Sequence, residues 1–210
     1  MEAPFELEAL KYLDGPLYTK HRDAWLRNTP NAGEVLRLQE QQPDWRTKVT
    51  ARILLTWLDH RTEAERLLDD VDHVDWGRER RKVSGSAPVP DDRRTWGSEH
   101  PELHGLLLPL CWEAALKRRK EWHENKRWIF FAMMQRAADE LTLEVLFWYL
   151  QVIADSRSEQ ALALSGLRRM PPAMVKPHVA SMKQQGKDFH ILFQVDFPQF
   201  FPGDPPGGPE

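Results

Sequence analysis

Short segments with apolar residues at helical spacing follow one another along most of this 210-residue chain. Breaks rich in Pro, Gly, Asn and Asp separate them. The clearest segment is residues 45–59, whose apolar face contains Val49, Ile53, Leu54, Trp57 and Leu58. About ten helices joined by short turns indicate consecutive helical hairpins. We therefore expect an all-α fold.

The spacing also predicts where other helices begin and which faces they bury. Asn31 with Glu34, and Thr62 with Glu65, have the pattern of capping pairs at helix starts. The inward faces are predicted to contain Phe5, Ala9, Tyr12 and Leu13 in residues 2–13; Leu17, His21, Ala24 and Trp25 in residues 16–27; and Ala64, Leu67, Leu68 and Val71 in residues 63–72.

The densest apolar sequence is residues 106–154, which contains four of the nine Trp and the only Cys. Residues 106–116 and 128–154 are apolar on most sides, as expected for helices that are buried all round. Cys111 lies within the first of these runs and is best interpreted as a small buried side chain. This part of the chain should form the middle of the fold.

One clear break interrupts the helical pattern. Residues 83–101 are rich in Pro, Gly and Ser and predict a long loop. We expect helical hairpins over residues 1–82 and 102–186, in one continuous domain. Residues 187–210 change in character, with a partly alternating stretch at 189–197 that predicts a short extended segment and a Pro/Gly tail that predicts disorder.

Two stretches share a pattern of charged and apolar residues. In the first, Asp44-Trp45-Arg46 precedes Val49, Ala51 and Leu54, and in the second, Asp155-Ser156-Arg157 precedes Ala161 and Leu164. Both resemble the HEAT repeat, in which an Asp-turn-Arg sequence enters the second helix and a small residue allows close packing. The resemblance covers about 50 residues and implies an α-α superhelix of stacked antiparallel hairpins, an α-solenoid. It also implies a binding scaffold and carries over no catalytic residue. A compact irregular bundle is the alternative fold.

Charge and composition narrow the classes of function. The net charge of −3 argues mildly against a chain built mainly to hold DNA or an anionic membrane. A single cysteine excludes an intramolecular disulfide and a multi-cysteine zinc site. The acidic start of the chain does not resemble a signal peptide. The longest apolar run, residues 128–134, is too short to cross a bilayer, so we expect a cytoplasmic protein without a membrane partner.

The sequence shows no recognisable catalytic or metal-binding motif. His-Asp dipeptides, as in helical HD-type hydrolases, do not occur. His123-Glu124 has Arg127 where a zincin would have its second histidine. His100 and His104 are four residues apart but have no further evident ligand. No nucleophile elbow or phosphate-binding loop occurs either. We therefore predict no catalytic residue, no metal site and no cofactor, although residues from distant positions could still converge.

A basic cluster rich in tryptophan is the strongest local signal for function. It is predicted to form a polar turn between helices. Three interpretations fit it: a solvated helix end, a surface that grips an acidic protein, or a site for phosphate backbones and bases. The predicted partner-binding residues are Lys117, Arg118, Arg119, Lys120, Trp122, Lys126 and Arg127.

A second candidate surface surrounds the predicted loop, where basic residues again accompany tryptophan: Trp76, Arg80, Arg81, Arg93, Arg94 and Trp96. Taken together, these features favour a non-catalytic scaffold or adaptor that binds another protein. The alternative is a nucleic-acid-binding protein on the same helical scaffold, which could process bases.

Overall fold

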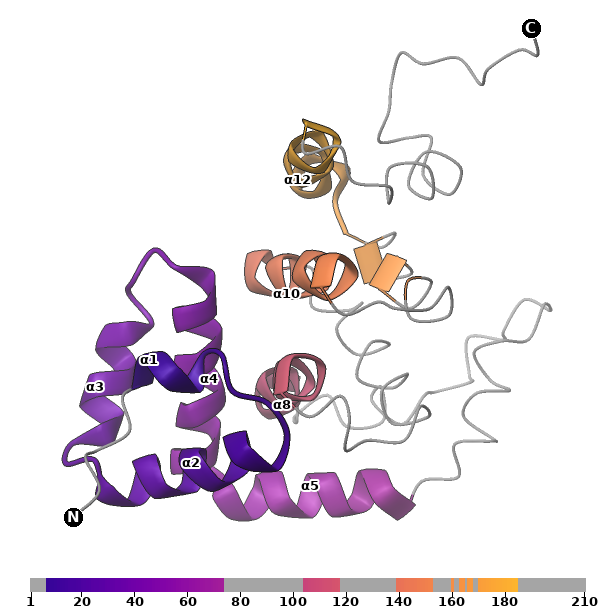
Figure 1. Ribbon diagram of the computed structural model, residues 1–210. Coiled ribbons are helices and arrows are strands. Elements are labelled where there is room, and N and C mark those ends of the chain that lie inside the picture. The colour runs from indigo at the N-terminus through magenta and orange to yellow at the C-terminus, as the bar shows by residue number, and fades with distance from the viewer. Residues whose placement is uncertain are drawn as a thin grey trace, which may run out of the picture. The chain divides into compact units, whose positions relative to one another are not determined.

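The computed structural model describes residues 7–73, 104–117, 139–152 and 170–184, together with residues 160, 163–164 and 166–167 (Figure 1). Every regular element in these residues is a helix, which confirms the predicted all-α class. The chain divides into two compact units, residues 1–134 and residues 135–210. The break at residues 83–101, which the sequence pattern marks, lies outside the described residues, and α8 belongs to the same unit as the helices before that break.

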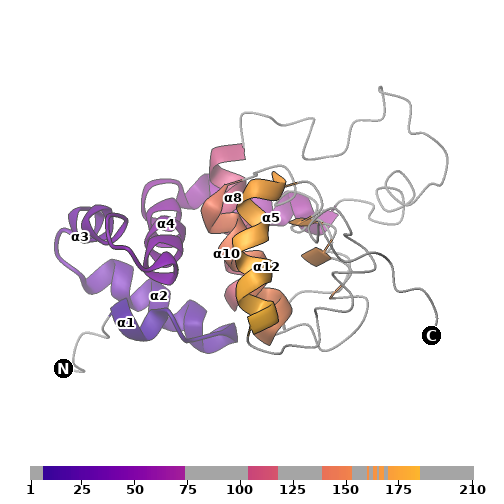
Figure 2. The same ribbon diagram turned by 90° about the horizontal axis from the view of Figure 1, so that it is seen from above.

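The first unit contains six described helices. They are α1 (Leu7–Leu10), α2 (Gly15–Asn28), α3 (Ala32–Gln39), α4 (Trp45–Asp59), α5 (Arg61–His73) and α8 (His104–Lys117). α4 lies between α3 and α8 and contacts both, while α5 and α2 also pack against it (Figure 1, Figure 2). Because α4 contacts every one of these neighbours, it is the central helix of the unit.

A cluster of apolar side chains joins the first four helices. Each fully buried leucine here stabilises the fold by about 1.5–3 kcal/mol relative to an exposed one. Four residues of the predicted α4 face are buried as expected, whereas Leu58 at its end is 37% exposed. The buried residues of the cluster are Leu10, Tyr18, Trp25, Ala32, Leu36, Ala51 and Leu54.

The buried face of α2 differs from the prediction. Leu17 is 52% exposed, and the buried residues are Gly15, Tyr18, Arg22 and Trp25, of which Trp25 was on the predicted face. An apolar pattern counts an arginine as polar, so it cannot predict a face that has Arg22 in its middle. The first helix shows a similar correction, because Leu10 is buried whereas Tyr12 is 66% exposed.

The start of α4 is capped by an acidic side chain. The carboxylate of Asp44 accepts hydrogen bonds from the backbone N–H of Thr47 at 2.9 Å and from its hydroxyl at 2.6 Å. This is the N-cap arrangement, in which a side-chain oxygen satisfies a backbone donor of the first helical turn. The cap therefore fixes the point at which the central helix begins.

The predicted capping pairs differ from the structure. Asn31 is the N-cap residue of α3, at the predicted helix start, but its side chain makes no cap hydrogen bond, and its backbone lies in the left-handed region, with φ 54°, and not in the extended conformation that is usual for an N-cap. α5 begins at Arg61, so Thr62 lies inside its first turn. Glu65 instead pairs with Arg61, one helical turn before it, at 2.9 Å.

The predicted core of residues 106–116 is confirmed for residues 109–115 of α8, whereas Leu106, Leu108 and Leu116 are only partly buried. Leu110, Cys111, Trp112, Ala114 and Ala115 are all buried. The same helix also buries two charged residues that the apolar pattern did not mark, Glu113 and Lys117. Pro109 lies inside the helix and has no N–H to donate to the carbonyl of Gly105.

The second unit contains α10 (Glu140–Val152) and α12 (Pro172–Gln184), which pack against each other. Asp139 caps α10 by accepting hydrogen bonds from the N–H and the hydroxyl of Thr142, at 3.0 and 2.7 Å. The His178 ring of α12 stacks on Phe147 of α10 with centroids 4.9 Å apart. In α10, which is the described part of the predicted core at residues 128–154, the buried apolar residues are Leu143, Val145, Leu146, Phe147, Tyr149 and Leu150.

Several predictions lie outside the described residues: the loop at 83–101, the part of the apolar stretch from 128 to 138, the extended segment at 189–197 and the tail. The stacking of the hairpins into a HEAT-like superhelix also stays a prediction. Within the part of the chain that the structure describes, no helix has the length and apolarity needed to cross a membrane.

Candidate functional site

A buried ion pair connects α2 to α8. Arg22 donates a 2.8 Å hydrogen bond from its Nη1 to the carboxylate of Glu113. The other carboxylate oxygen of Glu113 accepts a 2.6 Å hydrogen bond from the indole N–H of Trp57 on α4. The guanidinium also lies over the Trp57 ring, 3.8 Å from its centroid. One carboxylate therefore ties three helices together.

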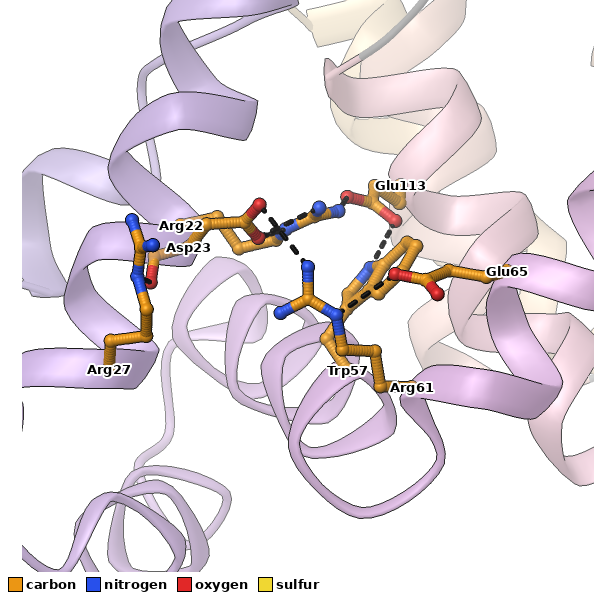
Figure 3. A network of polar contacts seen from close by, with 7 residues as sticks. All are labelled: Arg22, Asp23, Arg27, Trp57, Arg61, Glu65 and Glu113. Atoms are coloured by element: carbon orange, nitrogen blue, oxygen red, sulfur yellow. Dashed lines mark hydrogen bonds and ion pairs between the residues drawn. The ribbon is translucent and has the colours of Figure 1, made fainter.

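The network continues from the interior to the surface (Figure 3). The carboxylate of Asp23 accepts a hydrogen bond from Arg22 at 3.0 Å and lies 3.6 Å from Arg61, which in turn pairs with Glu65. Arg27 donates a hydrogen bond to the backbone carbonyl of Asp23. These outer members are partly or fully exposed, so each pair contributes little to stability by itself.

Burial by itself lowers the pKa of Arg22, but Glu113, Tyr18 and Asp23 together raise it above its ordinary value. Arg22 is therefore a permanent cation in the interior, and Glu113 is the buried carboxylate that pairs with it. The hydrogen bonds of Glu113 to Arg22 and Trp57 join α8 to α2 and α4, which belong to the same unit. We interpret the pair as a structural element that fixes how α2, α4 and α8 pack.

Lys117, at the end of α8, is the second buried charge. Its Nζ donates hydrogen bonds to the backbone carbonyls of Leu10 and Lys11, at 2.7 and 2.6 Å. These carbonyls lie at the end of the short helix α1, where the helix itself offers no N–H partner. Burial is the largest cause, and together with the positive charge of Arg46 it lowers the pKa of Lys117 to about 7.

The position of Lys117 corrects part of the prediction for the basic cluster. A residue that is 3% exposed does not present its charge to a partner, so the expectation that Lys117 lies in a solvated turn is wrong. The burial has a physical reason, because two carbonyls 106 and 107 residues earlier in the chain provide its hydrogen-bond acceptors. The other residues of the cluster lie outside the described residues, as do all those of the second surface: Arg118, Arg119, Lys120, Trp122, Lys126, Arg127, Trp76, Arg80, Arg81, Arg93, Arg94 and Trp96.

The first unit also has an open groove between α4 and α8, with a volume of about 640 Å³. Its apolar walls come from Leu55 on α4 and from Leu106, Leu108, Pro109 and Trp112 on α8. Thr56 and Gly105 complete the lining. We call this feature the α4–α8 groove.

Four polar residues that are partly or fully exposed also line the α4–α8 groove: Glu40, Arg52, Asp59 and His60. Arg52 donates a 3.0 Å hydrogen bond to Glu40, so these two charges neutralise each other. The carboxylate of Asp59 lies 4.0 Å from the guanidinium of Arg37, an exposed residue that does not line the groove. A concave site with apolar walls and a few polar groups at its edge is typical of a binding site.

The groove was not predicted, because its walls come from residues far apart in the sequence. One signal in the sequence was Pro109, four residues after Gly105 near the start of an apolar helix. A proline there has no N–H to donate to the carbonyl of Gly105, so one backbone hydrogen bond of the helix is missing. Leu55 was another, as an apolar residue beside the predicted face of residues 45–59. Neither signal specifies which helix lies opposite.

Among the residues that the structure describes, no group of three or more His, Cys, Asp or Glu side chains is placed to hold a metal ion. The α4–α8 groove is a concave feature of the described residues that a ligand could enter. Comparison with protein-family models, with curated proteins and with solved structures finds no match to this chain.

Proposed function

We propose that this chain is a protein-interaction module that binds a helical segment of another protein in the α4–α8 groove. The groove itself is the observation that carries the proposal. Its volume of about 640 Å³ lies within the range of ligand-binding sites, and Leu55, Leu106 and Leu108 in its walls are partly exposed. Amphipathic helices bind in such grooves by inserting apolar side chains spaced three and four residues apart.

The walls of the groove are firmly supported. Leu55 packs against the apolar cluster of α1 to α4, and Trp112 is 1% exposed. The buried pair of Arg22 and Glu113 holds α8 to α2, and Trp57 ties it to α4. A site built on fixed helices loses little conformational entropy when a ligand binds, which favours affinity.

The sequence resemblance to HEAT repeats supports the same class of function, since the first stretch that carries it, from Asp44 to Leu54, covers the cap and the N-terminal part of α4. In our proposal α4 contributes one wall of a binding surface of a stacked-hairpin scaffold. The partner is another protein, and the module performs no chemistry on it.

A selection from displayed peptides tests the proposal. A phage library of random 16-residue peptides is panned against the immobilised chain, and the enriched peptides are synthesised and titrated against three proteins. Leu106→Glu places a charge on the groove wall and should abolish binding. Leu38→Glu makes the same change at a 61% exposed leucine outside the groove lining and should leave binding unchanged.

The outcome that contradicts the proposal is equally clear. If no peptide is enriched, or if the enriched peptides bind Leu106→Glu as tightly as the unchanged chain, the α4–α8 groove is not the binding site. Circular dichroism of both variants verifies that the helices remain folded, because both leucines lie at partly or fully exposed positions.

A further inference from the structure

The buried amine of Lys117 has an unusual set of partners. Its Nζ donates to the backbone carbonyls of Leu10 and Lys11, and it lies 5.3 Å from the centre of the Tyr18 ring. Within the residues that the structure describes, no carboxylate forms an ion pair with this amine. Burying a charged amine without a carboxylate beside it costs free energy, so the closed fold favours the neutral form.

The carboxylate one helical turn before Lys117 is engaged elsewhere. Glu113 precedes Lys117 by four residues, the spacing at which a glutamate and a lysine commonly pair on a helix. Its two oxygens instead accept hydrogen bonds from Arg22 and Trp57. Glu113 therefore acts on Lys117 only through its charge, and the positive charge of Arg46 opposes that effect.

Lys117 holds the short helix α1 in place. α1 packs mainly against α2, and it buries Leu10 fully. Its other printed attachments are polar: Lys117 bonds to the carbonyls at its end, and the ammonium of Lys11 pairs with Asp44 and donates to Thr47 at the start of α4. A helix of four residues is too short to be stable alone, so α1 depends on these contacts.

Opening of α1 would change the charge of Lys117. In the closed fold the pKa of this amine is about 7, because burial and then the charge of Arg46 disfavour the protonated form. When α1 leaves, the amine meets water, and its pKa rises towards the ordinary value of 10.5. Between these two values opening takes up a proton, so the closed form should gain on the open form as pH rises, by up to about tenfold per pH unit.

Titratable or charged groups face Lys117 from each neighbouring element. They are Lys11 after α1, Asp14 before α2, Tyr18 on α2, Arg46 on α4 and Glu113 on α8 itself. The bonds of the Lys11 ammonium also break when α1 opens. Burial acts to lower the pKa of Lys11, but Glu8 and Asp44 raise it above 10.5, so this ammonium is charged in both forms at pH 9 and below. Lys11 therefore adds no dependence on pH in the window where Lys117 does.

From these contacts we propose that α1 is a proton-linked latch, which opens while the rest of the first unit stays folded and lets Lys117 take up a proton as it opens. The closed latch hides a neutral amine. The open latch exposes a cation that directly precedes Arg118 in the sequence, where the predicted basic cluster continues. This inference does not depend on the α4–α8 groove, so it and the proposed function succeed or fail separately.

Hydrogen exchange measures the opening of α1. The amides of Lys11, Tyr12 and Leu13 donate to carbonyls of α1, so they exchange when it opens. Their protection factors, and those of amides in the middle of α4, are measured at pH 7, 8 and 9 against an unstructured peptide of the same sequence. The α1 amides should be less protected than the α4 amides at every pH, and their protection should rise by up to about tenfold per pH unit.

Two variants assign the proton to Lys117. Lys117→Met removes the titrating amine, so the protection of its α1 amides should stay constant between pH 7 and 9. Lys20→Met makes the same change at an exposed lysine of α2 and should keep the dependence on pH.

Three results would overturn the latch. If the α1 amides of the unchanged chain are as protected as those of α4, α1 does not open separately. If their protection does not change with pH, opening takes up no proton. If it changes equally in Lys117→Met, the proton belongs to another group. The first two readings use the unchanged chain, so they decide the question even where Lys117→Met does not fold.

Discussion

Glu113 on α8 accepts a 2.8 Å hydrogen bond from Arg22 on α2, which lies 91 residues earlier in the chain. Both side chains are almost fully buried, at 2% and 4% exposure. Removing the water shell of two charges costs free energy that only a well-formed pair offsets. Two additional hydrogen bonds support the pair: the indole N–H of Trp57 donates to Glu113, and Arg22 donates to Asp23.

Loss of one member of this pair should destabilise the fold strongly. Glu113→Ala leaves the guanidinium of Arg22 buried without its main partner, and the free energy of unfolding should fall by about 3–5 kcal/mol. The double variant Arg22→Met/Glu113→Leu removes both charges and should be more stable than Glu113→Ala. Urea denaturation followed by circular dichroism measures all three proteins. If the double variant is no more stable than Glu113→Ala, the unpaired charge of Arg22 is not the cause of the lost stability.

Lys117 should make stability depend on pH in an unusual direction. Its pKa is about 7 in the folded state and near 10.5 when the chain is unfolded. Between these values the unfolded chain binds more protons, so the free energy of unfolding should rise with pH, by at most about 1.4 kcal/mol per pH unit. A neutral amine retains two N–H groups, so it can keep both bonds to the carbonyls of Leu10 and Lys11.

Lys117→Met, which has no titrating group at this position, isolates this contribution. Urea denaturation of both proteins at pH 7, 8 and 9 should show the unchanged chain gaining stability relative to the variant as pH rises. If the two curves of stability against pH are parallel, Lys117 does not titrate in this range in the folded state.

Asp44 should contribute to stability at neutral pH and lose this contribution in acid. Burial acts to raise its pKa, but the two hydrogen bonds from Thr47 and the charge of Lys11 lower it below 3.8. The unfolded carboxyl therefore protonates first, and the stabilisation is lost as pH falls through the lower, folded pKa. Asp44→Ala should cost about 1 kcal/mol at pH 7, as is usual for a lost N-cap, and less in strong acid.

Asp44→Ser provides the matched control for that experiment. A serine hydroxyl accepts the same backbone hydrogen bond without a charge, so most of the stability at pH 7 should return while the dependence on acid pH should not. Thermal unfolding at pH 7 and at pH 3 distinguishes the two variants. Equal destabilisation by both would show that the cap bond to Thr47 is unimportant.

Cys111 should be unreactive in the folded protein. Its side chain is fully buried, and burial raises the pKa of the thiol well above 9, so the reactive thiolate is absent at neutral pH. Ellman's reagent should label it only as fast as the first unit opens, and at once in urea. Since it is the only cysteine, the signal has one source. Rapid labelling of the native protein would contradict the packing of α8.

The basic cluster stays a predicted partner surface. Because Lys117 is buried, the charge-reversal test of this surface should leave Lys117 unchanged. Charge reversal at Arg118, Arg119 and Lys120 should abolish capture of partner proteins from a lysate and leave the melting temperature nearly unchanged. The matched control reverses three exposed basic residues elsewhere: Lys20, Arg66 and Lys176. Capture that is unaffected in the first variant, or lost equally in both, would remove this surface.

Local sequence patterns located most of the helices that the structure describes, although α1 is shorter than the predicted segment 2–13. Residues 45–59 were predicted as a helix and form α4 with the same bounds, because apolar spacing and the breaks beside it are properties of neighbouring residues. The buried run of α8 followed for the same reason, since a segment that is apolar on all sides can only be placed in a core.

The tertiary structure decided which charged residues are buried and where a ligand could bind. Arg22, Glu113 and Lys117 look like ordinary polar residues in the sequence, and their burial depends on partners 91 to 107 positions away. The α4–α8 groove likewise exists only because two distant helices lie side by side. Desolvation of a charge is favourable only beside its partner, and no local pattern specifies that partner.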